Sequence, residues 1–95
     1  MDYWASIAFL DTDVQLEAAR CADELGFAGV ALPDHLFWSD ALEATYPYTP
    51  DGKPMWTADM HWPDPWVLMA AMAQVTRRIR FTTNIYVAPA RDLFT

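Results

Sequence analysis

The fold is decided by Ala28-Gly29-Val30-Ala31-Leu32-Pro33-Asp34-His35 (residues 28–35), an apolar run that ends on an acid and an imidazole. The short apolar segment 30–32, bounded by glycine and proline, is typical of a buried strand. In α/β proteins with parallel sheets, residues that leave the carboxyl end of a strand face the ligand. We therefore predict that Asp34 and His35 lie at the edge of a functional site.

A helix precedes this strand, and an earlier strand precedes the helix. Residues 3–10 are aromatic and apolar on both faces, as in a strand buried on two sides. Thr12 and Gln15 form a capping-box signature, and Gly26 supplies a left-handed stop. Because a full helix separates the two strands, we expect them to be parallel. Helical spacing predicts an apolar, core-forming face made of Val14, Ala18, Cys21, Ala22 and Leu25. The other face is predicted to carry Glu17, Arg20, Asp23 and Glu24.

A long loop and a second helix follow. Residues 34–64 show no clear period, and connections longer than about 15 residues usually serve function. Within them, Thr49-Pro50-Asp51-Gly52 is a strong turn signal. Asp64 is a good cap for a helix that continues to about Thr76 and is apolar nearly all round, so we expect that helix to be largely buried. Residues 79–87 are β-branched and aromatic enough for a third strand.

The chain is thus predicted to be an α/β protein with three parallel strands, two helices and a long loop. A (β/α)8 barrel of the TIM type needs about eight strands and typically about 250 residues. We therefore expect a partial TIM barrel, with residues 1–95 as the truncated N-terminal segment of a longer domain. Ala88 to Thr95 are expected to lead into a missing helix. The isolated chain is expected to be inactive and to self-associate through exposed barrel surfaces.

Charge and cysteine content narrow the class of protein. Thirteen acidic against six basic residues give a formal charge of −7, which disfavours nucleic acid or an anionic membrane as a partner. The lone Cys21 and the lack of a signal peptide or long apolar run predict a cytoplasmic protein. No metal site is expected, since His35 and His61 lie far apart without ligand spacing, and His61 is interpreted as solvent-facing.

Five motifs occur in one order along nearly the whole chain. They are Glu24-Leu25-Gly26-Phe27, Leu32-Pro33-Asp34-His35-Leu36-Phe37, Tyr46-Pro47-Tyr48-Thr49-Pro50-Asp51-Gly52, Trp62-Pro63-Asp64-Pro65-Trp66 and Val75-Thr76-Arg77-Arg78-Ile79-Arg80-Phe81-Thr82-Thr83-Asn84. Together they resemble the amino-terminal third of the bacterial luciferase-like superfamily, and most of all its actinobacterial oxidoreductases that use the deazaflavin coenzyme F-420. The resemblance implies a TIM-type barrel that binds a flavin or deazaflavin at the carboxyl ends of its strands.

The resemblance also implies site residues. Asp34 and His35 match the family's catalytic pair beside the cofactor ring. The segment Thr83-Asn84-Ile85-Tyr86 matches the bulge on which the ring rests, with a cis peptide expected at Asn84–Ile85; many relatives have glycine in place of Asn84. Trp38 is a candidate wall of the substrate pocket. From the residues alone, a loop histidine bonded to backbone is the simpler interpretation of His35, and the resemblance reverses that preference. Asp34 is explained as either an orienting group for His35 or a purely structural one.

The function that follows is hydride transfer between coenzyme F-420 and a small organic substrate, with the imidazole handling the accompanying proton. One alternative is a monooxygenase of the same fold that uses flavin mononucleotide (FMN). Another is a non-catalytic fragment that needs further strands or chains.

Overall fold

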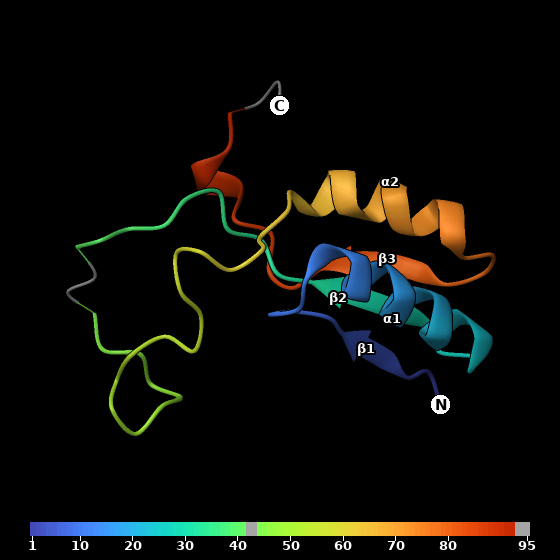
Figure 1. Cartoon of the computed structure of the whole chain (residues 1–95), viewed down its shortest axis with the longest axis horizontal. Helices are drawn as coiled ribbons and strands as arrows, with labels where there is room; N and C mark the ends of the chain where they lie inside the picture. The colour runs from blue at the N-terminus through green and yellow to red at the C-terminus, as the bar shows by residue number, and fades with distance from the viewer. Residues whose placement is uncertain (42–43, 93–95) are drawn as a thin grey trace.

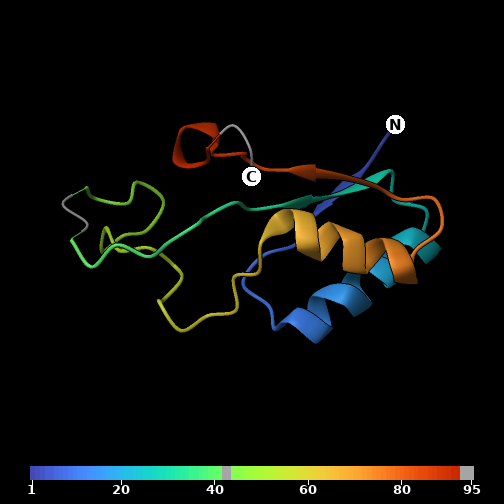
Figure 2. The same ribbon diagram turned by 90° about the horizontal axis from the view of Figure 1, so that it is seen from above.

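A three-stranded sheet with two helices on one of its faces forms the body of the protein (Figures 1 and 2). The computed structural model describes residues 1–41 and 44–92. The elements are β1 (Trp4–Ser6), α1 (Thr12–Glu24), β2 (Gly29–Leu32), α2 (Pro65–Val75), β3 (Arg80–Thr83) and the short 3-10 helix η1 (Ala88–Ala90). All strand pairs are parallel and the order is β1-β2-β3, so the predicted α/β arrangement is confirmed.

The two faces of the sheet differ in what covers them. Val30 and Leu32 of β2 are buried under the helices, and Val30 pairs with Phe81 of β3. On the opposite face the ring of Trp4 crosses Gly29, where a Cβ atom would lie 2.1 Å from a ring carbon. A side chain at position 29 would displace the ring of Trp4, so close approach of an aromatic ring, rather than backbone conformation, favours glycine here.

The hydrophobic core lies between the sheet and the helices. Helix α1 packs on both α2 and β2, which closes one compact layer of apolar side chains. The buried apolar residues are Ile7, Ala19, Ala22, Val30, Leu32, Leu68, Met69, Met72 and Ile79. Most of the core thus comes from the central strand and the two helices.

The buried face of helix α1 only partly matches the predicted face. Val14 and Leu25 are 47% and 71% exposed, and Cys21 is exposed rather than part of the core. The buried apolar positions are Ala19 and Ala22, whose small side chains allow the helix to approach its neighbours closely. The prediction is confirmed for Ala22, which is buried, and for Ala18, which packs against the core, and is wrong for Val14, Cys21 and Leu25. Spacing alone cannot tell large apolar residues at the helix margin from small ones at the contact.

The start of α1 also differs from the prediction. Thr12 is the first helical residue rather than the cap, and Asp11 at the N-cap makes no side-chain hydrogen bond to the helix. Gln15 is buried, and its amide donates to the carbonyl of Leu10 at 2.7 Å. The capping-box prediction is therefore wrong, whereas the left-handed stop at Gly26 is confirmed by its φ of 81°.

Asp23 was predicted to face solvent but is buried. Its carboxylate accepts hydrogen bonds from the backbone N–H groups of Arg77 (2.7 Å), Arg78 (3.2 Å) and Ile79 (3.0 Å). These bonds, with that of Arg77 first, hold the pKa of Asp23 below its usual value. A side chain of α1 therefore holds the turn between α2 and β3.

The strands are shorter than the sequence predicted. β1 covers residues 4–6 instead of 3–10, and β3 covers residues 80–83 instead of 79–87. Both lengths follow from β2, which has four residues and is followed by Pro33, a residue without a backbone N–H group. Beyond the end of β2, the strands β1 and β3 have no backbone groups of β2 with which to form hydrogen bonds.

Helix α2 begins as predicted, but more of its apolar surface is exposed to solvent than predicted. Asp64 accepts from the N–H groups of Trp66 (2.9 Å) and Val67 (3.2 Å), which confirms the cap. The side chains of Trp66 and Val67 are 54% and 69% exposed, so one apolar face of the helix is open in the described part of the chain.

Two further findings concern the described residues. Neither helix among residues 1–41 and 44–92 has the length and apolar character needed to cross a bilayer. The predicted connection into a further helix after Ala88 falls partly on residues 93–95, which lie outside the described residues; residues 88–90 form η1.

We predict that Asp23→Asn lowers the thermal midpoint of unfolding by more than about 4 °C. An amide offers one acceptor oxygen in place of two, so at least one backbone N–H group of the α2–β3 turn would face an NH2 group. Because the pKa of Asp23 is lowered in the folded state, its contribution is present above the usual carboxyl range and is lost as the pH falls through that lowered pKa.

The matched control is Asp13→Asn, the same change at an exposed position of the same helix. Circular dichroism melts of both variants at pH 7 and pH 3 test the prediction. Equal midpoints for the two variants at pH 7 would show that Asp23 does not hold the turn.

Candidate functional site

The long loop leaves the carboxyl edge of β2 and projects away from the sheet (Figure 1). Residues 33–41 and 44–64 contain no helix or strand. The predicted turn is confirmed, because the N–H of Gly52 donates to the carbonyl of Thr49 at 3.2 Å and Gly52 has a φ of 71°. The loop therefore depends on side-chain packing rather than on a hydrogen-bonded ladder.

Aromatic rings supply that packing, and Trp56 is at their centre. Its ring lies 5.8 Å from Phe9, 5.2 Å from Tyr46 and 5.8 Å from Trp62. His35 joins the cluster at 5.6 Å from Trp56 and 5.1 Å from Trp62, edge to face with the latter. Phe9 has a φ of 60°, which is uncommon for a bulky residue and occurs where its ring stacks on Trp56. The segment after β1 and the long loop thus meet around His35.

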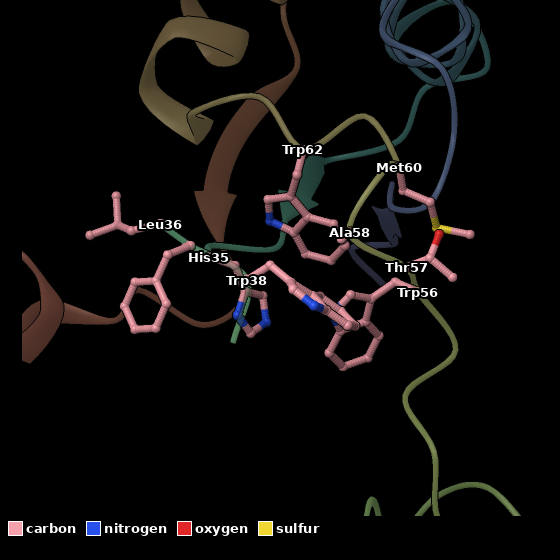
Figure 3. Close-up of a pocket in the computed structure, with 9 residues that line it drawn as sticks. His35, Leu36, Trp38, Trp56, Thr57, Ala58, Met60 and Trp62 are labelled. Atoms are coloured by element: carbon pink, nitrogen blue, oxygen red, sulfur yellow. The ribbon is translucent and has the colours of Figure 1, made fainter. Parts of the chain in front are cut away.

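A pocket of about 120 Å³ opens beside His35 (Figure 3). Figure 3 shows the indole rings of Trp56 and Trp62 beside the imidazole. The lining residues are His35, Leu36, Phe37, Trp38, Trp56, Thr57, Ala58, Met60 and Trp62. We call this the tryptophan pocket.

A second pocket, of about 180 Å³, shares part of this wall. It is lined by His35, Leu36, Phe37, Trp38, Ser39, Trp56, Val87 and Ala90. We call it the η1 pocket, because Ala90 belongs to that helix and Val87 precedes it. His35 therefore borders two adjoining spaces.

Trp38, the candidate substrate wall, lines both pockets. Its indole N–H donates to the carboxylate of Asp40 at 3.1 Å, a local contact that fixes the ring orientation. The position agrees with a role in binding a small molecule, and a substrate contact stays a prediction.

Asp34 is buried and is held from two sides. Its Oδ2 accepts the N–H of Val87 at 2.9 Å, and its Oδ1 accepts from Arg91 at 2.6 Å. The hydrogen bond from Arg91 is the largest of the causes that keep the pKa of Asp34 below its usual value. Both oxygens are thus engaged with residues 87–91, and within the described residues no hydrogen bond joins Asp34 to His35. This geometry corresponds to the structural alternative for Asp34.

Arg91 was not singled out by the sequence. Its side chain is 7% exposed and also reaches the carboxylate of Asp64 at 3.1 Å, and its guanidinium lies 5.5 Å from the ring of Tyr86. The two carboxylates hold the pKa of Arg91 above its usual value, so the charge is permanent. The available signal was an arginine directly after the apolar run 85–90, which follows the third strand.

The predicted ring-binding segment lies next to the end of β2. Thr83 pairs with Leu32, and the N–H of Asn84 donates to the carbonyl of Leu32 at 2.6 Å. The peptide bond Asn84–Ile85 is cis, as the resemblance implied. The side chain of Ile85 is 77% exposed, and the ring of Tyr86 packs edge to face on that of Trp66 at 5.8 Å.

His61 has a partner that the sequence did not suggest. Its Nδ1 accepts the N–H of Thr12 at 3.2 Å, at the first turn of α1. The side chain is 54% exposed, so His61 is a surface residue with a local structural contact. In the part of the chain that the structure describes, no three His, Cys, Asp or Glu side chains gather in a way that could hold a metal ion.

We predict that the amide resonance of Val87 titrates with a midpoint below about pH 3.8, because protonation of Asp34 removes the acceptor of its N–H group. The sign follows from the lowered folded-state pKa: the contact is present above the usual pKa and is lost as the pH falls through the lowered one. Arg91→Gln should raise the midpoint, since the first cause of the shift is removed.

The control for this titration is Arg80→Gln, which removes an exposed arginine that pairs with Asp2 at the other side of the sheet. Two-dimensional NMR spectra recorded from pH 7 to pH 2.5 give the midpoints. A midpoint that does not change in Arg91→Gln would contradict the assigned contact.

The chain is similar in sequence to a known protein family and to several bacterial proteins. Residues 10–95 match the profile of the luciferase-like monooxygenases. Uncharacterized protein Rv0940c of Mycobacterium tuberculosis (strain H37Rv) is 30% identical over 84 residues, which cover 88% of this chain and 29% of that protein. Uncharacterized protein Rv0953c of the same strain is 33% identical over 78 residues, 82% of this chain and 28% of that protein. The chain therefore spans less than a third of the length of these relatives. No solved structure matches the chain significantly.

Proposed function

The chain belongs to the luciferase-like monooxygenase family, and from this premise we propose that it contributes His35 to an oxidoreductase that uses coenzyme F-420. The reaction is hydride transfer between the deazaflavin ring and a small organic substrate. Family membership supports the oxidoreductase class, and the resemblance described above supports the deazaflavin.

The observation that carries the proposal is the position of His35 on the border of two pockets. A redox enzyme of this kind must place a flat ring and a substrate carbon next to each other, with a proton-handling group in reach of the substrate. The η1 pocket and the tryptophan pocket adjoin along His35 to Trp38. We assign the ring to the η1 side and the substrate to the tryptophan side.

The residues on the η1 side fit the ring better than the tail of the coenzyme. Val87 and Ala90 line that pocket, and the exposed Ile85 lies two residues before Val87, so the surface offered is apolar. No Lys or Arg side chain lines either pocket in the described residues, and Arg91 is already paired with two carboxylates. The partners of an anionic tail are therefore expected outside the described part of the chain.

In this arrangement the coenzyme and the side chains have different roles. When bound, the coenzyme supplies the hydride chemistry. The apolar side chains around Val87 hold the ring and exclude water, and the His35 imidazole holds or moves the proton of a substrate hydroxyl or carbonyl group. Asp34 acts indirectly, because it fixes residues 87–91 beside the end of β2.

We further propose that the three strands belong to a (β/α)8 barrel. Parallel strands with both helices on one face are the repeating unit of such barrels, in which the other face of the sheet lines the interior. Here that face carries Trp4, Gly29 and Arg80 at the amino end of the strands, whereas His35 follows the carboxyl end, where barrel enzymes bind their ligands.

A second candidate is an FMN-dependent monooxygenase on the same scaffold. It is favoured by the description of the matching family, luciferase-like monooxygenases. The two candidates differ in the ring that binds and in the use of oxygen.

We expect deazaflavin to bind with a change in ring fluorescence to a form of the protein extended to full barrel length, and FMN to bind more weakly. Titration of the 95-residue chain and of the extended form with each ring compares the candidates. Tighter binding of FMN, with oxygen consumption on turnover, would favour the monooxygenase. Binding of neither ring by either form would contradict both candidates.

We predict that His35→Gln in the extended form lowers turnover by about 100-fold while leaving ring binding largely intact, because a proton-handling group contributes roughly 10²–10⁴-fold. The matched control is His61→Gln, which changes the other histidine of the chain, at the N-terminus of α1. Unchanged turnover in His35→Gln would remove the imidazole from the mechanism, and an equal loss in both variants would indicate a general effect on folding.

A further inference from the structure

The tryptophan pocket has a distinctive charge pattern. None of the six Lys and Arg residues of the chain, all of which the structure describes, is among its lining residues. Two carboxylates near the lining accept hydrogen bonds from lining residues: Asp40 from Trp38 at 3.1 Å, and Asp59 from Thr57 at 2.6 Å. A third, Asp34 beside His35, is buried and paired with Arg91. An anionic group placed here would lose its hydration without gaining a cation.

The pocket also offers little stabilisation to a cation. The lining residues include no carboxylate, and Asp40 and Asp59, which lie outside the lining, each use one oxygen to accept a hydrogen bond from a lining residue. Contact with aromatic faces stabilises a cation by about 0.5–2 kcal/mol, which is less than the several kcal/mol needed to desolvate an unpaired ion. The balance favours an occupant without charge.

The volume and polar groups of the pocket define the occupant further. An apolar protein cavity of about 150 Å³ can hold one benzene molecule, and the tryptophan pocket has about 120 Å³ and opens to solvent. The Trp38 indole N–H and the Thr57 hydroxyl are engaged with their aspartates. This leaves two polar groups of the lining for a ligand: the imidazole of His35, and the indole N–H of Trp62, which is buried and has no hydrogen-bond partner among the described residues. One ring with one hydrogen-bonding group matches these features.

We infer that the tryptophan pocket takes an uncharged molecule built on a single six-membered ring, with one hydroxyl or carbonyl group that hydrogen-bonds to His35. This inference rests on the proposed function for calling that molecule the substrate, but the binding itself does not need the coenzyme. Phosphorylated, carboxylated and amine-bearing rings are expected to bind more weakly by the same argument.

The test uses three rings of equal shape and different charge: benzyl alcohol, benzoate and benzylammonium. Each is titrated into the ¹⁵N-labelled 95-residue chain at pH 7 while the indole N–H resonances of its five tryptophans are followed. Benzyl alcohol should shift the resonances of Trp56 and Trp62 and bind at least tenfold more tightly than either ion. The resonances of Trp4 and Trp66, which line neither pocket, are internal controls and should not move.

A pair of charge variants links the selectivity to this pocket. Met60 lines it, whereas Met55 is in the same loop, is 55% exposed and does not line it. Met60→Lys should tighten benzoate binding by about tenfold and Met55→Lys by much less, since a lysine outside the lining interacts with the bound carboxylate through water, where the Coulomb energy of a charge pair is small.

Three results would overturn the inference: an ion that binds as tightly as the alcohol, shifts of equal size at Trp4 and Trp66, or the same effect in both lysine variants. These failures are distinct from failure of the proposed function. Coenzyme binding by the extended form without selectivity among the three rings would contradict the inference alone. Selective binding of the alcohol without coenzyme binding would contradict the proposed function alone.

Discussion

The pairing of β2 on both of its edges is the constraint on which the rest of the structure depends. Val30 and Leu32 lie under the helices, while Gly29 leaves room for the ring of Trp4 on the other face. The strand ends at Pro33, so the ladders end there as well. This end point decides where His35 leaves the sheet, and therefore where the two pockets can form.

Two buried carboxylates hold the connections at opposite ends of this sheet. Asp23 accepts the backbone N–H groups of residues 77–79 where β3 begins, and Asp34 accepts Val87 and Arg91 beyond the point where β3 ends. In both cases the acceptor lies more than 50 residues from its donors along the chain. A lowered pKa at each site is the electrostatic consequence, since the hydrogen bonds favour the charged form.

The long loop shows how the site depends on contacts between distant segments. Trp56 and Trp62 of the loop pack on Phe9, which follows β1, and the same indoles flank His35, which follows β2. The wall of the tryptophan pocket is therefore assembled from one continuous loop, but its orientation is set by the segment after β1. This arrangement gives the pocket an aromatic lining without Lys, Arg, Asp or Glu and places one imidazole on its border.

The sequence by itself determined the order of strands and helices, the parallel pairing, the cap at Asp64, the helix stop at Gly26 and the turn that ends at Gly52, because each depends on a short run of residues and its local backbone preferences. It also placed His35 at the end of a strand. Only the tertiary structure decided which face of α1 is buried, how far β1 and β3 extend, and that Asp23 and Arg91 are structural partners of distant groups. The physical reason is that burial, strand length and ion pairing depend on which surfaces meet across the fold, and spacing along one segment does not contain that information.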